Sequence, residues 1–453
     1  MKNFITKIID NDIKNGLPKK KLKFRFSPEP NGILHIGHIK AIYINFKLAK
    51  IYKTKINLRF DDTNPKNENY KFIKKIINDI KWLGFKYNKI TFTSDYFSIL
   101  YKWSKNLIKK GKAYIQKKTN NKIYNIININ DNLHLFKNMK KGKYKENNYI
   151  LRAKINIKSK NYYLKDPIMY RIINKPHFKT NNKWYIYPTY DWAHGQSDYI
   201  EKISHSLCSI EFQNHKKLYN WFLNKIYNKK YNKIKPKQIE FSRLNIIDSI
   251  TSKRKLYILK KKKIINNYND PRLCTINSFK KRGYKKKFLI NFIKKIGYSK
   301  RENNISINVL ETNIKKYLIK KSPKLMVIFN PIKITIINLP KKSIKWIYIK
   351  DKKIKNRIIP LTRKIYIEKN DFKKNKNNNF YRLNLINYVR LKYYNIIKIV
   401  KIINNKIYCK LYNNNKILNK KIKSTIQWIS TKYYKKINIL LYNYIYYKII
   451  IYF

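Results

Sequence analysis

The stretch LKFRFSPEPNGILHIGH, residues 22–38, decides the fold of this chain. Leu22, Phe24 and Phe26 alternate with polar residues, which is the period of a half-buried β-strand. The turn-forming residues S-P-E-P-N-G end that strand, and from His38 the apolar residues recur with a helical period. A strand, a turn and a helix in this order begin a βαβ unit.

The residues that follow repeat the same order. Ile56, Leu58 and Phe60 alternate again, and D-D-T-N-P then breaks the strand. Apolar residues at helical spacing run through residues 73–83, and Gly84 is placed to close that helix. Two strand–helix units within about 60 residues predict a parallel, doubly wound sheet.

Changes in composition divide the rest of the chain into regions. Residues 100–189 are mixed, whereas residues 190–260 return to alternating strand and helix signals. Residues 261–330 are basic and helical, and residues 331–453 carry short apolar runs separated by Lys/Asn turns. We therefore expect an α/β catalytic domain of residues 1–99 and 190–260, an inserted subdomain, a helical connecting subdomain and an all-β C-terminal region.

The chain is strongly basic, with 106 Lys+Arg against 23 Asp+Glu and a net charge of +83 over 453 residues. Such a field attracts polyanions and favours salt-dependent binding of nucleic acid. However, Lys, Asn, Ile, Tyr and Phe all have A+T-rich codons, and Gly occurs only 9 times. Codon bias therefore explains much of the charge, which by itself is weak evidence for an RNA partner.

The cysteines and the apolar segments indicate the cellular compartment of the protein. Cys208, Cys274 and Cys409 are scattered, with no CxxC and no zinc-ligand spacing. No segment reaches 18 apolar residues, the N-terminus lacks a signal-peptide core, and the Tyr/Ile-rich residues 439–453 are typical of a strand. We expect a cytoplasmic protein with no structural metal and no membrane anchor.

His35 and His38 stand on either side of Gly37, where the first strand gives way to a helix. A helix N-terminus favours phosphate, and glycine lets a nucleotide approach the backbone closely. Two imidazoles can donate to a phosphoryl group as charge builds on it. The alternative is that the two histidines merely cap the helix, but the P-E-P-N-G lead-in favours a nucleotide site.

A second candidate motif is T-S-K-R-K, residues 251–255. Lys253 in such a basic loop can neutralise pyrophosphate as it leaves. Basic runs are common in this chain, so only the position of the motif, far after His38, distinguishes it from a solvated surface segment.

These residues resemble those of class I aminoacyl-tRNA synthetases, marked by H-I-G-H and a K-M-S-K-S-like loop. Within that class the chain is similar to glutaminyl-tRNA synthetases. The resemblance rests on P-E-P-N-G-I-L-H-I-G-H, L-R-F-D-D-T-N-P, Y-D-W-A-H-G-Q-S-D, I-S-H-S-L-C-S-I-E-F-Q, E-F-S-R-L-N and D-P-R-L-C-T-I-N-S-F-K-K-R-G-Y, in that order. It implies a Rossmann-like catalytic domain, an acceptor-stem-binding insertion at 100–189 and a β-barrel anticodon-binding region that is shortened at 331–453.

The resemblance also implies site residues. Those for ATP are Glu29, Pro30, Asn31, His35, Ile36, Gly37, His38, Ile39, Lys40, Ala41, Ser209, Arg243, Leu244, Thr251, Ser252 and Lys253. Those for glutamine are Asp61 at the ammonium, Tyr190 at the amide, and His194, Gln238 and Arg25 nearby. The chemistry agrees, because an ammonium needs a carboxylate and an amide needs neutral, oriented partners. The alternative for Tyr190 is a core position, since the chain has 40 tyrosines.

The implied reaction is centred on phosphorus. Glutamine attacks the α-phosphate of ATP, which arrives with Mg²⁺, and His35, His38 and Lys253 stabilise the departing pyrophosphate. A ribose hydroxyl of tRNA(Gln) then attacks the adenylate carbonyl, and AMP is released. No protein nucleophile and no dedicated metal site are expected, and we expect a monomer.

The chain departs from the family pattern at a few positions. Thr251 replaces the usual Met, Asn214 replaces a common Asp, and the β region after residue 331 is shorter than in the family. Two other interpretations remain open: a glutamyl-tRNA synthetase of the related subgroup, and a non-catalytic tRNA-binding relic of a synthetase.

Lys253→Ala tests the role of the 251–255 loop. We expect turnover to fall by about a hundredfold or more, because one charge that stabilises the transition state is removed. Steady-state charging rates measure this, and near-normal turnover would show that the loop is not part of the site.

Overall fold

The computed structural model describes residues 3–119, 122–228, 234–247, 249–349, 357–375, 379–413, 422 and 424–440. The side chains of Thr119, Lys122, Lys253 and Asn303 lie outside this description. The chain divides into two compact units, an N-terminal unit up to Asn313 and a C-terminal unit of Ile314–Leu441. The four predicted domain boundaries are a finer division than this and stay predictions.

A parallel sheet lies at the centre of the N-terminal unit. Its strands are β1 (Lys23–Phe26), β2 (Lys55–Phe60), β3 (Ile90–Phe92), β9 (His205–Ser209) and β10 (Lys237–Phe241). β1, β2 and β3 pair in that order, and β9 pairs with β10. Ser204 N donates to Lys23 O over 3.0 Å, so β9 begins beside β1. The two halves of the sheet therefore meet between β1 and β9, at a topological switch point.

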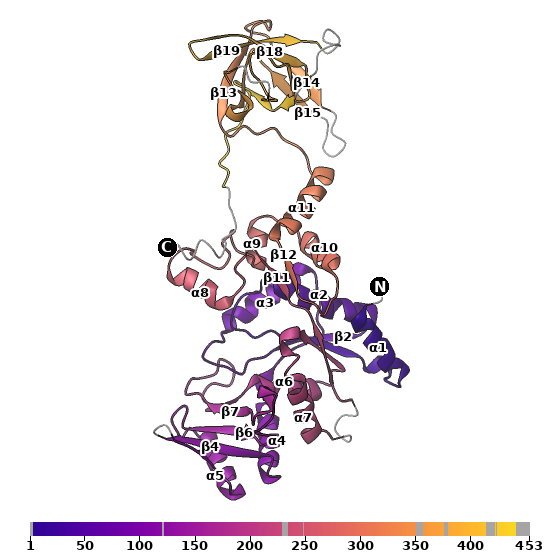
Figure 1. Ribbon diagram of the computed structural model, residues 1–453, viewed down its shortest axis with the longest axis vertical. Helices are drawn as coiled ribbons and strands as arrows, with labels where there is room; N and C mark the ends of the chain where they lie inside the picture. The colour runs from indigo at the N-terminus through magenta and orange to yellow at the C-terminus, as the bar shows by residue number, and fades with distance from the viewer. Residues whose placement is uncertain are drawn as a thin grey trace. The chain divides into compact units, whose positions relative to one another are not determined.

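Helices connect and cover these strands (Figure 1). They are α1 (Phe4–Lys14), α2 (Ile36–Ile51), α3 (Tyr70–Leu83), α6 (Tyr190–Ile200) and α7 (Lys216–Ile226). Gly84 ends α3 in the left-handed conformation with φ 87°, which a residue with a side chain adopts only with strain. The parallel α/β sheet predicted from residues 22–84 is confirmed.

The region between β3 and α6 forms an antiparallel sheet of its own, in the order β5-β4-β6-β7-β8. Its strands are β4 (Ala113–Thr119), β5 (Lys122–Asn125), β6 (Tyr149–Ala153), β7 (Ile168–Ile172) and β8 (Ile186–Pro188). Figure 1 shows α4 (Phe97–Lys109) and α5 (Ile129–Lys140) beside these strands. Phe97, Phe136 and Leu151 belong to the apolar core that joins these helices to the sheet.

Helices follow the central parallel sheet. They are α8 (Lys253–Lys261), α9 (Ile276–Lys281), α10 (Lys286–Ile296) and α11 (Ile307–Lys321). A parallel pair of strands, β11 (Leu244–Ile246) and β12 (Asn303–Ile305), lies among them. One-turn 3₁₀ helices occur at Lys19–Lys21, Thr93–Tyr96, Tyr162–Leu164, Ile210–Phe212 and Lys369–Asp371.

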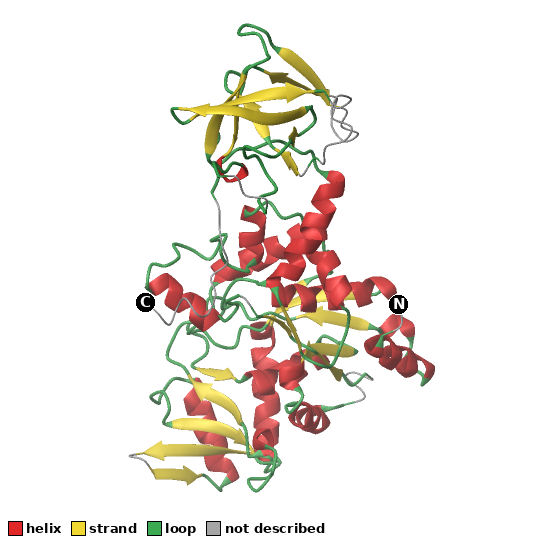
Figure 2. Cartoon of the chain, turned by 45° about the horizontal axis from the view of Figure 1, so that its top comes forward, coloured by secondary structure: helices red, strands yellow, loops and turns green. Residues whose placement is uncertain are grey.

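The described part of the C-terminal unit is almost entirely strands and loops (Figure 2). Its main sheet has the order β20-β17-β18-β19-β13-β16-β21, and β14 pairs with β15 beside it. The strands are β13 (Pro331–Ile336), β14 (Lys345–Ile349), β15 (Arg357–Leu361), β16 (Lys364–Glu368), β17 (Val389–Leu391), β18 (Ile396–Ile403), β19 (Lys406–Tyr412), β20 (Ser424–Ile426) and β21 (Trp428–Ser430).

The two edges of this seven-stranded sheet are adjacent along the chain. β20 lies at one edge and β21 at the other, and only Gln427 separates them. The sheet must therefore curl until its edges approach one another. The described strands include no ladder between β20 and β21, so the predicted barrel stays a prediction, whereas the predicted all-β character is confirmed. The strand predicted at residues 439–453 falls largely on residues 441–453, outside the described part.

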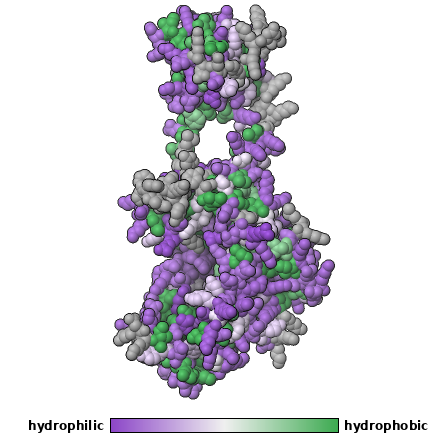
Figure 3. All heavy atoms as spheres, viewed as in Figure 1, coloured by the Kyte–Doolittle hydropathy of each residue, from purple (hydrophilic) through white to green (hydrophobic). Residues whose placement is uncertain are grey.

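Hydrophilic side chains dominate the face of the molecule drawn in Figure 3, as expected from the net charge of +83. In the part of the chain that the structure describes, no helix combines the length and the apolar character needed to cross a membrane.

Strand β13 shows how alternating apolar and polar residues build the core of the C-terminal unit. Ile334 and Ile336 are fully buried, whereas Lys333, which precedes Ile334 on the same strand, is exposed. We expect Ile334→Ala to destabilise the C-terminal unit by about 2–5 kcal/mol, because it leaves a cavity in that core. Lys333→Ala is the matched control and should change stability by less than about 0.5 kcal/mol. Urea unfolding followed by circular dichroism measures both, and equal stability of the two variants would contradict this packing.

Candidate active site

A cavity of about 350 Å³ opens at the switch point of the parallel sheet. Its walls come from the ends of β1 and β9, the first turns of α2 and α6, and the β10–β11 connection. The lining residues are Arg25, Phe26, Ser27, Pro28, Glu29, His35, Gly37, His38, Lys40, Ala41, Asn45, Tyr190, His194, Leu207, Cys208, Ser209, Glu211, Phe212, Phe241, Arg243 and Leu244. Open α/β sheets bind their ligands at this place.

The two histidines of H-I-G-H both cap α2 and line the cavity. His35 is the N-cap, and its Nδ1 accepts a hydrogen bond from Gly37 N over 3.1 Å. His38 Nδ1 accepts from His35 N over 3.1 Å, and the two rings lie 4.0 Å apart. In each neutral ring the proton is therefore on Nε2, which makes Nε2 a donor. Capping and ligand binding, the two alternatives for these residues, are compatible here.

Gly37 accepts no side chain at this turn. A Cβ at this position would lie 2.9 Å from His35 Cε1 and 3.5 Å from Leu244 O. The first contact is closer than carbon atoms tolerate, so any other residue would displace the capping ring. The glycine thus preserves the position of His35 as well as access to the helix N-terminus.

Lys40 is a buried cation in the cavity wall. Its residue is 1% exposed, and Nζ donates to Ser242 Oγ over 2.7 Å. Within the described part of the chain no carboxylate lies within ion-pair distance of it. Burial lowers the pKa of Lys40 from 10.5 to about 8. Asn45, on the same helix, also lines the cavity, and its buried Oδ1 makes no hydrogen bond with any described residue.

A buried ion-pair cluster lies behind the opposite wall, centred on Asp198 of α6. Asp198 Oδ1 accepts from Arg25 Nε over 3.0 Å and from Arg59 Nη1 over 2.7 Å. Arg59 Nε also donates to Asp61 Oδ1 over 2.9 Å. All four side chains are at least 97% buried. Because the arginines come from β1 and β2, the cluster fastens α6 to the sheet.

The cluster holds both aspartates ionised. Burial alone would raise the pKa of Asp61, but Arg59, His194 and Arg25 together outweigh burial and lower it to about 2. The pKa of Asp198 is lowered still further, because Arg25 and Arg59 together overcome the effect of burial. Neither carboxylate therefore takes up a proton near neutral pH.

His194 connects this cluster to the cavity. Arg25 Nη2 lies 2.6 Å from His194 Nε2, and Asp61 Oδ2 lies 3.3 Å from Nδ1. An arginine can only donate, so the short Arg25 contact makes Nε2 an acceptor and places the ring proton on Nδ1, which faces both Asp61 Oδ2 and, at 3.2 Å, Arg59 Nη2. Burial lowers the pKa of His194, which agrees with a neutral ring. The Arg25 and Asp61 contacts favour this tautomer, whereas the Arg59 contact at Nδ1 opposes it.

Tyr190 forms the wall next to His194. Its ring stacks on His194 with centroids 4.6 Å apart and contacts Phe212 at 5.1 Å. Burial and the nearby Asp61 raise the pKa of Tyr190, so its hydroxyl keeps its proton. Among the described residues, none makes a hydrogen bond with this hydroxyl, which faces the cavity as a neutral donor and acceptor.

Glu201 strengthens the attachment of α6. Its carboxylate accepts from Asn57 Nδ2 and from Thr91 Oγ1, each over 2.8 Å. These partners lie on β2 and β3, so the C-terminal end of α6 is fastened to the sheet as well. The helix that carries Tyr190 and His194 is therefore fixed along its length.

The cavity is lined by twelve of the predicted site residues. Those that line it are Arg25, Glu29, His35, Gly37, His38, Lys40, Ala41, Tyr190, His194, Ser209 and Arg243, together with Leu244. Those outside its lining are Pro30, Asn31, Ile36, Ile39, Asp61, Gln238, Thr251 and Ser252. The side chain of Lys253, which begins α8, is outside the described part.

Two of the predicted residues outside the cavity lining make hydrogen bonds that support its wall. Asp61 is 2% exposed and lies behind His194, with Oδ1 bound to Arg59 and Thr93. Gln238 Nε2 donates to Phe212 O over 3.0 Å and to Glu240 Oε1 over 3.1 Å. Both residues thus support the wall of the cavity in this structure.

Sequence reasoning missed Arg59 and Asp198. Both stand inside quoted motifs, L-R-F-D-D and G-Q-S-D, and each interrupts a buried element. The signal was their charge, since carboxylates are scarce in this chain and an arginine inside an apolar strand needs a buried partner. Their pairing across 139 residues of sequence is not visible before the fold is known.

Comparison with known proteins gives the family. Residues 21–320 match the catalytic domain of the class I (E and Q) tRNA synthetases, and residues 322–412 match the anticodon-binding domain of the same group. The chain belongs to this synthetase family. A glutamine–tRNA ligase of Buchnera aphidicola subsp. Schizaphis graminum is 44% identical over 95% of this chain and 81% of that protein. Glutamine–tRNA ligases of Clostridium kluyveri and Rhodopirellula baltica are 39% and 37% identical, over 89% and 97% of this chain and 75% and 77% of those proteins.

The buried ammonium of Lys40 has a consequence for stability. Between pH 8 and 10.5 the unfolded synthetase binds the proton that the folded one has lost, so its free energy of unfolding rises with pH across this window. Below pH 8 the full cost of burying the charge applies, roughly 3 kcal/mol. We expect Lys40→Met to be more stable than the unaltered chain at pH 7, by up to about this amount.

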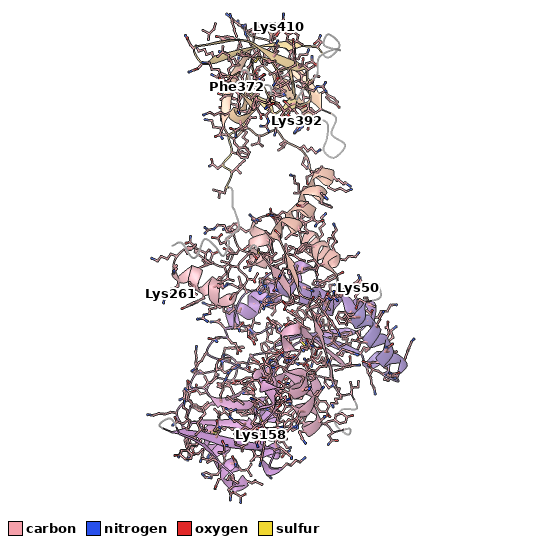
Figure 4. The ribbon with its side chains drawn as sticks, in the orientation of Figure 1. Lys50, Lys158, Lys261, Phe372, Lys392 and Lys410 are labelled. Atoms are coloured by element: carbon pink, nitrogen blue, oxygen red, sulfur yellow. The ribbon has the colours of Figure 1, made fainter. Side chains whose placement is uncertain are left out.

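Urea unfolding at several pH values measures this difference. The Lys40→Met variant should show a flatter pH dependence between pH 8 and 10.5. Lys50→Met, at an exposed lysine of the same helix (Figure 4), is the control and should behave like the unaltered chain. Loss of stability at pH 7 in Lys40→Met would contradict an uncompensated buried charge.

Proposed function

We propose that this synthetase attaches L-glutamine to tRNA(Gln) with ATP, through a glutaminyl-adenylate, and releases AMP and pyrophosphate. The observation that carries the proposal is the neutral wall of the cavity. His194 and Tyr190 form this wall, and neither carries a net charge. The glutamine–tRNA ligases among its relatives support it, at 37–44% identity over most of the chain.

The ATP phosphates would lie at the N-terminus of α2. His35 and His38 present Nε2 donors there, and the helix dipole adds partial positive charge. Glu29, Ser209, Arg243 and Leu244 line the rest of this side of the cavity. Lys253 would reach the departing pyrophosphate from the start of α8. Pro30, Asn31, Ile36, Ile39, Thr251 and Ser252 would complete this part of the site around the nucleotide.

Mg²⁺ would enter as part of the ATP substrate. In the described part of the chain no group of three His, Cys, Asp or Glu side chains is placed to hold a metal ion. The ion would therefore depend mainly on phosphate oxygens for its ligands. The protein's own contribution to charge stabilisation is then the histidine pair, the α2 N-terminus and the 251–253 loop.

The glutamine side chain would lie against Tyr190 and His194. An amide offers both a donor and an acceptor, and the Tyr190 hydroxyl can satisfy either. Arg25 borders this wall, but its guanidinium already donates to Asp198, Ser206 Oγ and Leu207 O. The substrate ammonium would be attracted by Asp61, one hydrogen bond behind His194. Gln238 would hold Phe212, the neighbour of Tyr190, in place.

The same wall disfavours glutamate. A glutamate carboxylate needs an unpaired cation, whereas Arg25 is neutralised by Asp198 and His194 is held neutral. Burying an unpaired carboxylate costs several kcal/mol. This observation favours glutamine over the glutamyl-tRNA synthetase alternative.

The remaining regions would bind the tRNA. We propose that the antiparallel sheet of the insertion at 100–189 receives the acceptor stem, and that the C-terminal unit contacts the anticodon end, as the matched domain does in its family. A monomer in the cytoplasm is the simplest form of such an enzyme.

Charging of tRNA(Gln) with glutamine and glutamate, measured side by side, tests this function. We expect kcat/KM for glutamine to exceed that for glutamate by about 10⁴-fold, the discrimination typical of a site that hydrogen-bonds its substrate. Preference for glutamate would identify a glutamyl-tRNA synthetase. Tight tRNA binding with neither amino acid transferred would identify a non-catalytic relic.

A further inference from the structure

The residues that join β2 to α3 (Figure 1) are bonded to the turn that begins the nucleotide motif. Asp61 N donates to Pro28 O over 3.1 Å, and Asn69 N donates to Pro30 O over 3.0 Å. We call residues 61–69 the aspartate segment. Because Asp61 is the residue proposed to attract the substrate ammonium, the contacts that hold this segment bear on amino-acid binding.

A buried histidine of the insertion (residues 100–189) also contacts the aspartate segment. His177 Nε2 lies 3.1 Å from Asp62 O, across 115 residues of sequence. Both residues are fully buried. A carbonyl oxygen can only accept, so Nε2 carries the ring proton and donates it. The insertion is thereby bonded to the backbone of the residue next to Asp61.

The second ring nitrogen of His177 agrees with this assignment. Nδ1 accepts from Lys179 N over 3.2 Å and from Thr180 N over 3.3 Å, so it carries no proton. Burial lowers the pKa of His177 to about 4, which keeps the ring neutral at pH 7. The N–H of Nε2 is therefore the one donor of this ring, and it is directed at Asp62.

A tight turn and an apolar core hold the ring in place. His177 and Asn181 exchange two backbone hydrogen bonds, and Asn181 takes the left-handed conformation with φ 50°, which asparagine tolerates. The imidazole lies edge-on to Phe97 at 5.8 Å and stacks on Tyr187 at 6.0 Å between ring centroids. Both aromatic rings belong to the core of the insertion, so the donor is fixed with respect to that core.

The side chains of the two aspartates are held from another direction. Ser94, which follows β3, donates from N to Asp62 Oδ1 over 2.8 Å and from Oγ to Oδ2 over 2.6 Å. Thr93 Oγ1 donates to Asp61 Oδ1 over 3.0 Å. Among the described residues, His177 alone donates to the Asp62 carbonyl. The backbone at Asp62 therefore depends on the insertion, whereas the carboxylates depend on the central sheet.

Attachment of the insertion does not by itself explain this bond. Lys175 Nζ donates to Lys66 O over 3.2 Å, and Lys66 forms an ion pair with Glu146. These contacts already join the insertion to the outer part of the aspartate segment. The bond from His177 is made at the inner end instead, beside Asp61.

We propose that His177 is a positioning residue for the amino-acid site. It fixes the backbone at Asp62 and so holds the Asp61 carboxylate behind His194, which makes the affinity for the amino acid depend on the insertion. The proposal rests on the proposed function, which supplies the α-ammonium that Asp61 attracts. Without the donor, the buried carbonyl of Asp62 has no partner and the segment shifts. Only a fraction of the molecules then keeps Asp61 in place, and the apparent affinity falls by that fraction.

Three variants of the full chain test this role. His177→Phe keeps a ring in the pocket and removes the donor, whereas His177→Gln offers an amide N–H near the position of Nε2. His177→Asn, whose amide is too short to reach Asp62 O, is a second donor-deleted variant in case phenylalanine disturbs the packing. Melting curves show which variants are folded.

Tyr187→Phe is the matched control. It removes a hydroxyl that donates to Lys175 O over 3.2 Å and to Trp184 O over 3.0 Å, next to the same ring. Its hydroxyl makes no hydrogen bond with the described residues of the aspartate segment. It therefore weakens the same part of the insertion without touching the proposed contact.

Steady-state charging of tRNA(Gln) gives the first measurement, with the amino acid that the unaltered chain uses. We expect His177→Phe to raise KM for the amino acid by about tenfold. KM for ATP should change by less than about twofold, because the N-terminus of α2 is fixed by its own histidine caps. His177→Gln and Tyr187→Phe should stay within about threefold of the unaltered chain in both constants.

Two outcomes of this assay would overturn the proposal. The first is an unchanged KM for the amino acid in both donor-deleted variants. The second is an equal rise in the KM values of both substrates, or an equal effect of Tyr187→Phe, because the bond would then stabilise the insertion in general.

Hydrogen exchange of the aspartate segment gives a second measurement that needs no catalysis. Its hydrogen-bonded amides report loosening of the segment, and they belong to Asp61, Asn64, Asn67 and Asn69. We expect exchange about tenfold faster in His177→Phe and unchanged in His177→Gln and Tyr187→Phe. Equal exchange in His177→Phe and the unaltered chain would also overturn the proposal.

The two measurements separate this inference from the proposed function. If the unaltered chain charges glutamate instead, the function is wrong, but KM for glutamate tests His177 equally well because both amino acids carry the same ammonium. If neither is charged, the function is wrong and hydrogen exchange alone decides whether His177 holds the segment. If glutamine is charged with an unchanged KM in the donor-deleted variants, the function stands and the role of His177 is wrong.

Discussion

A single buried carboxylate, Asp198, lies between two buried guanidiniums and fixes the wall of the candidate active site. Arg25 and Arg59 come from adjacent strands, whereas Asp198 comes from α6, so their ion pairs fix the helix on the sheet. Removing one partner of such a cluster leaves an unpaired buried charge, which costs about 3–5 kcal/mol. Because Tyr190 and His194 are carried by the same helix, their positions in the cavity depend on this contact.

The cluster also determines the chemistry of the wall. Arg25 Nη2 donates to His194 Nε2 over 2.6 Å, and the Nδ1 side of the ring faces Asp61 Oδ2 at 3.3 Å and Arg59 Nη2 at 3.2 Å. With Asp198 neutralising Arg25, the cavity has a neutral wall on this side and a helix N-terminus with two imidazole donors on the other. A neutral amide and a polyphosphate are the ligands that match these two halves.

The sequence was sufficient for the parallel sheet, because its signals are local: strand and helix periods in residues 22–84 and a glycine where α3 ends. It was also sufficient for His35 and His38, since a helix N-terminus places neighbours in sequence side by side. It could not show that Asp61 lies behind the cavity wall or that the Gln238 amide is bound to Phe212, because side-chain direction depends on partners distant in sequence. The burial of Lys40 without a counter-ion was hidden for the same reason, as was the hydrogen bond from His177 to the Asp62 carbonyl.

The central claim is that Asp198 keeps the cavity wall of Tyr190 and His194 neutral by pairing with Arg25. The amino-acid selectivity of the Asp198→Asn variant tests this claim most directly. The ratio of kcat/KM for glutamine to that for glutamate is measured for this variant and for the unaltered synthetase. We predict that the ratio falls by at least about tenfold, because an unneutralised Arg25 then attracts the glutamate carboxylate. A ratio that stays the same, in a variant whose circular dichroism shows a native fold, would contradict the account.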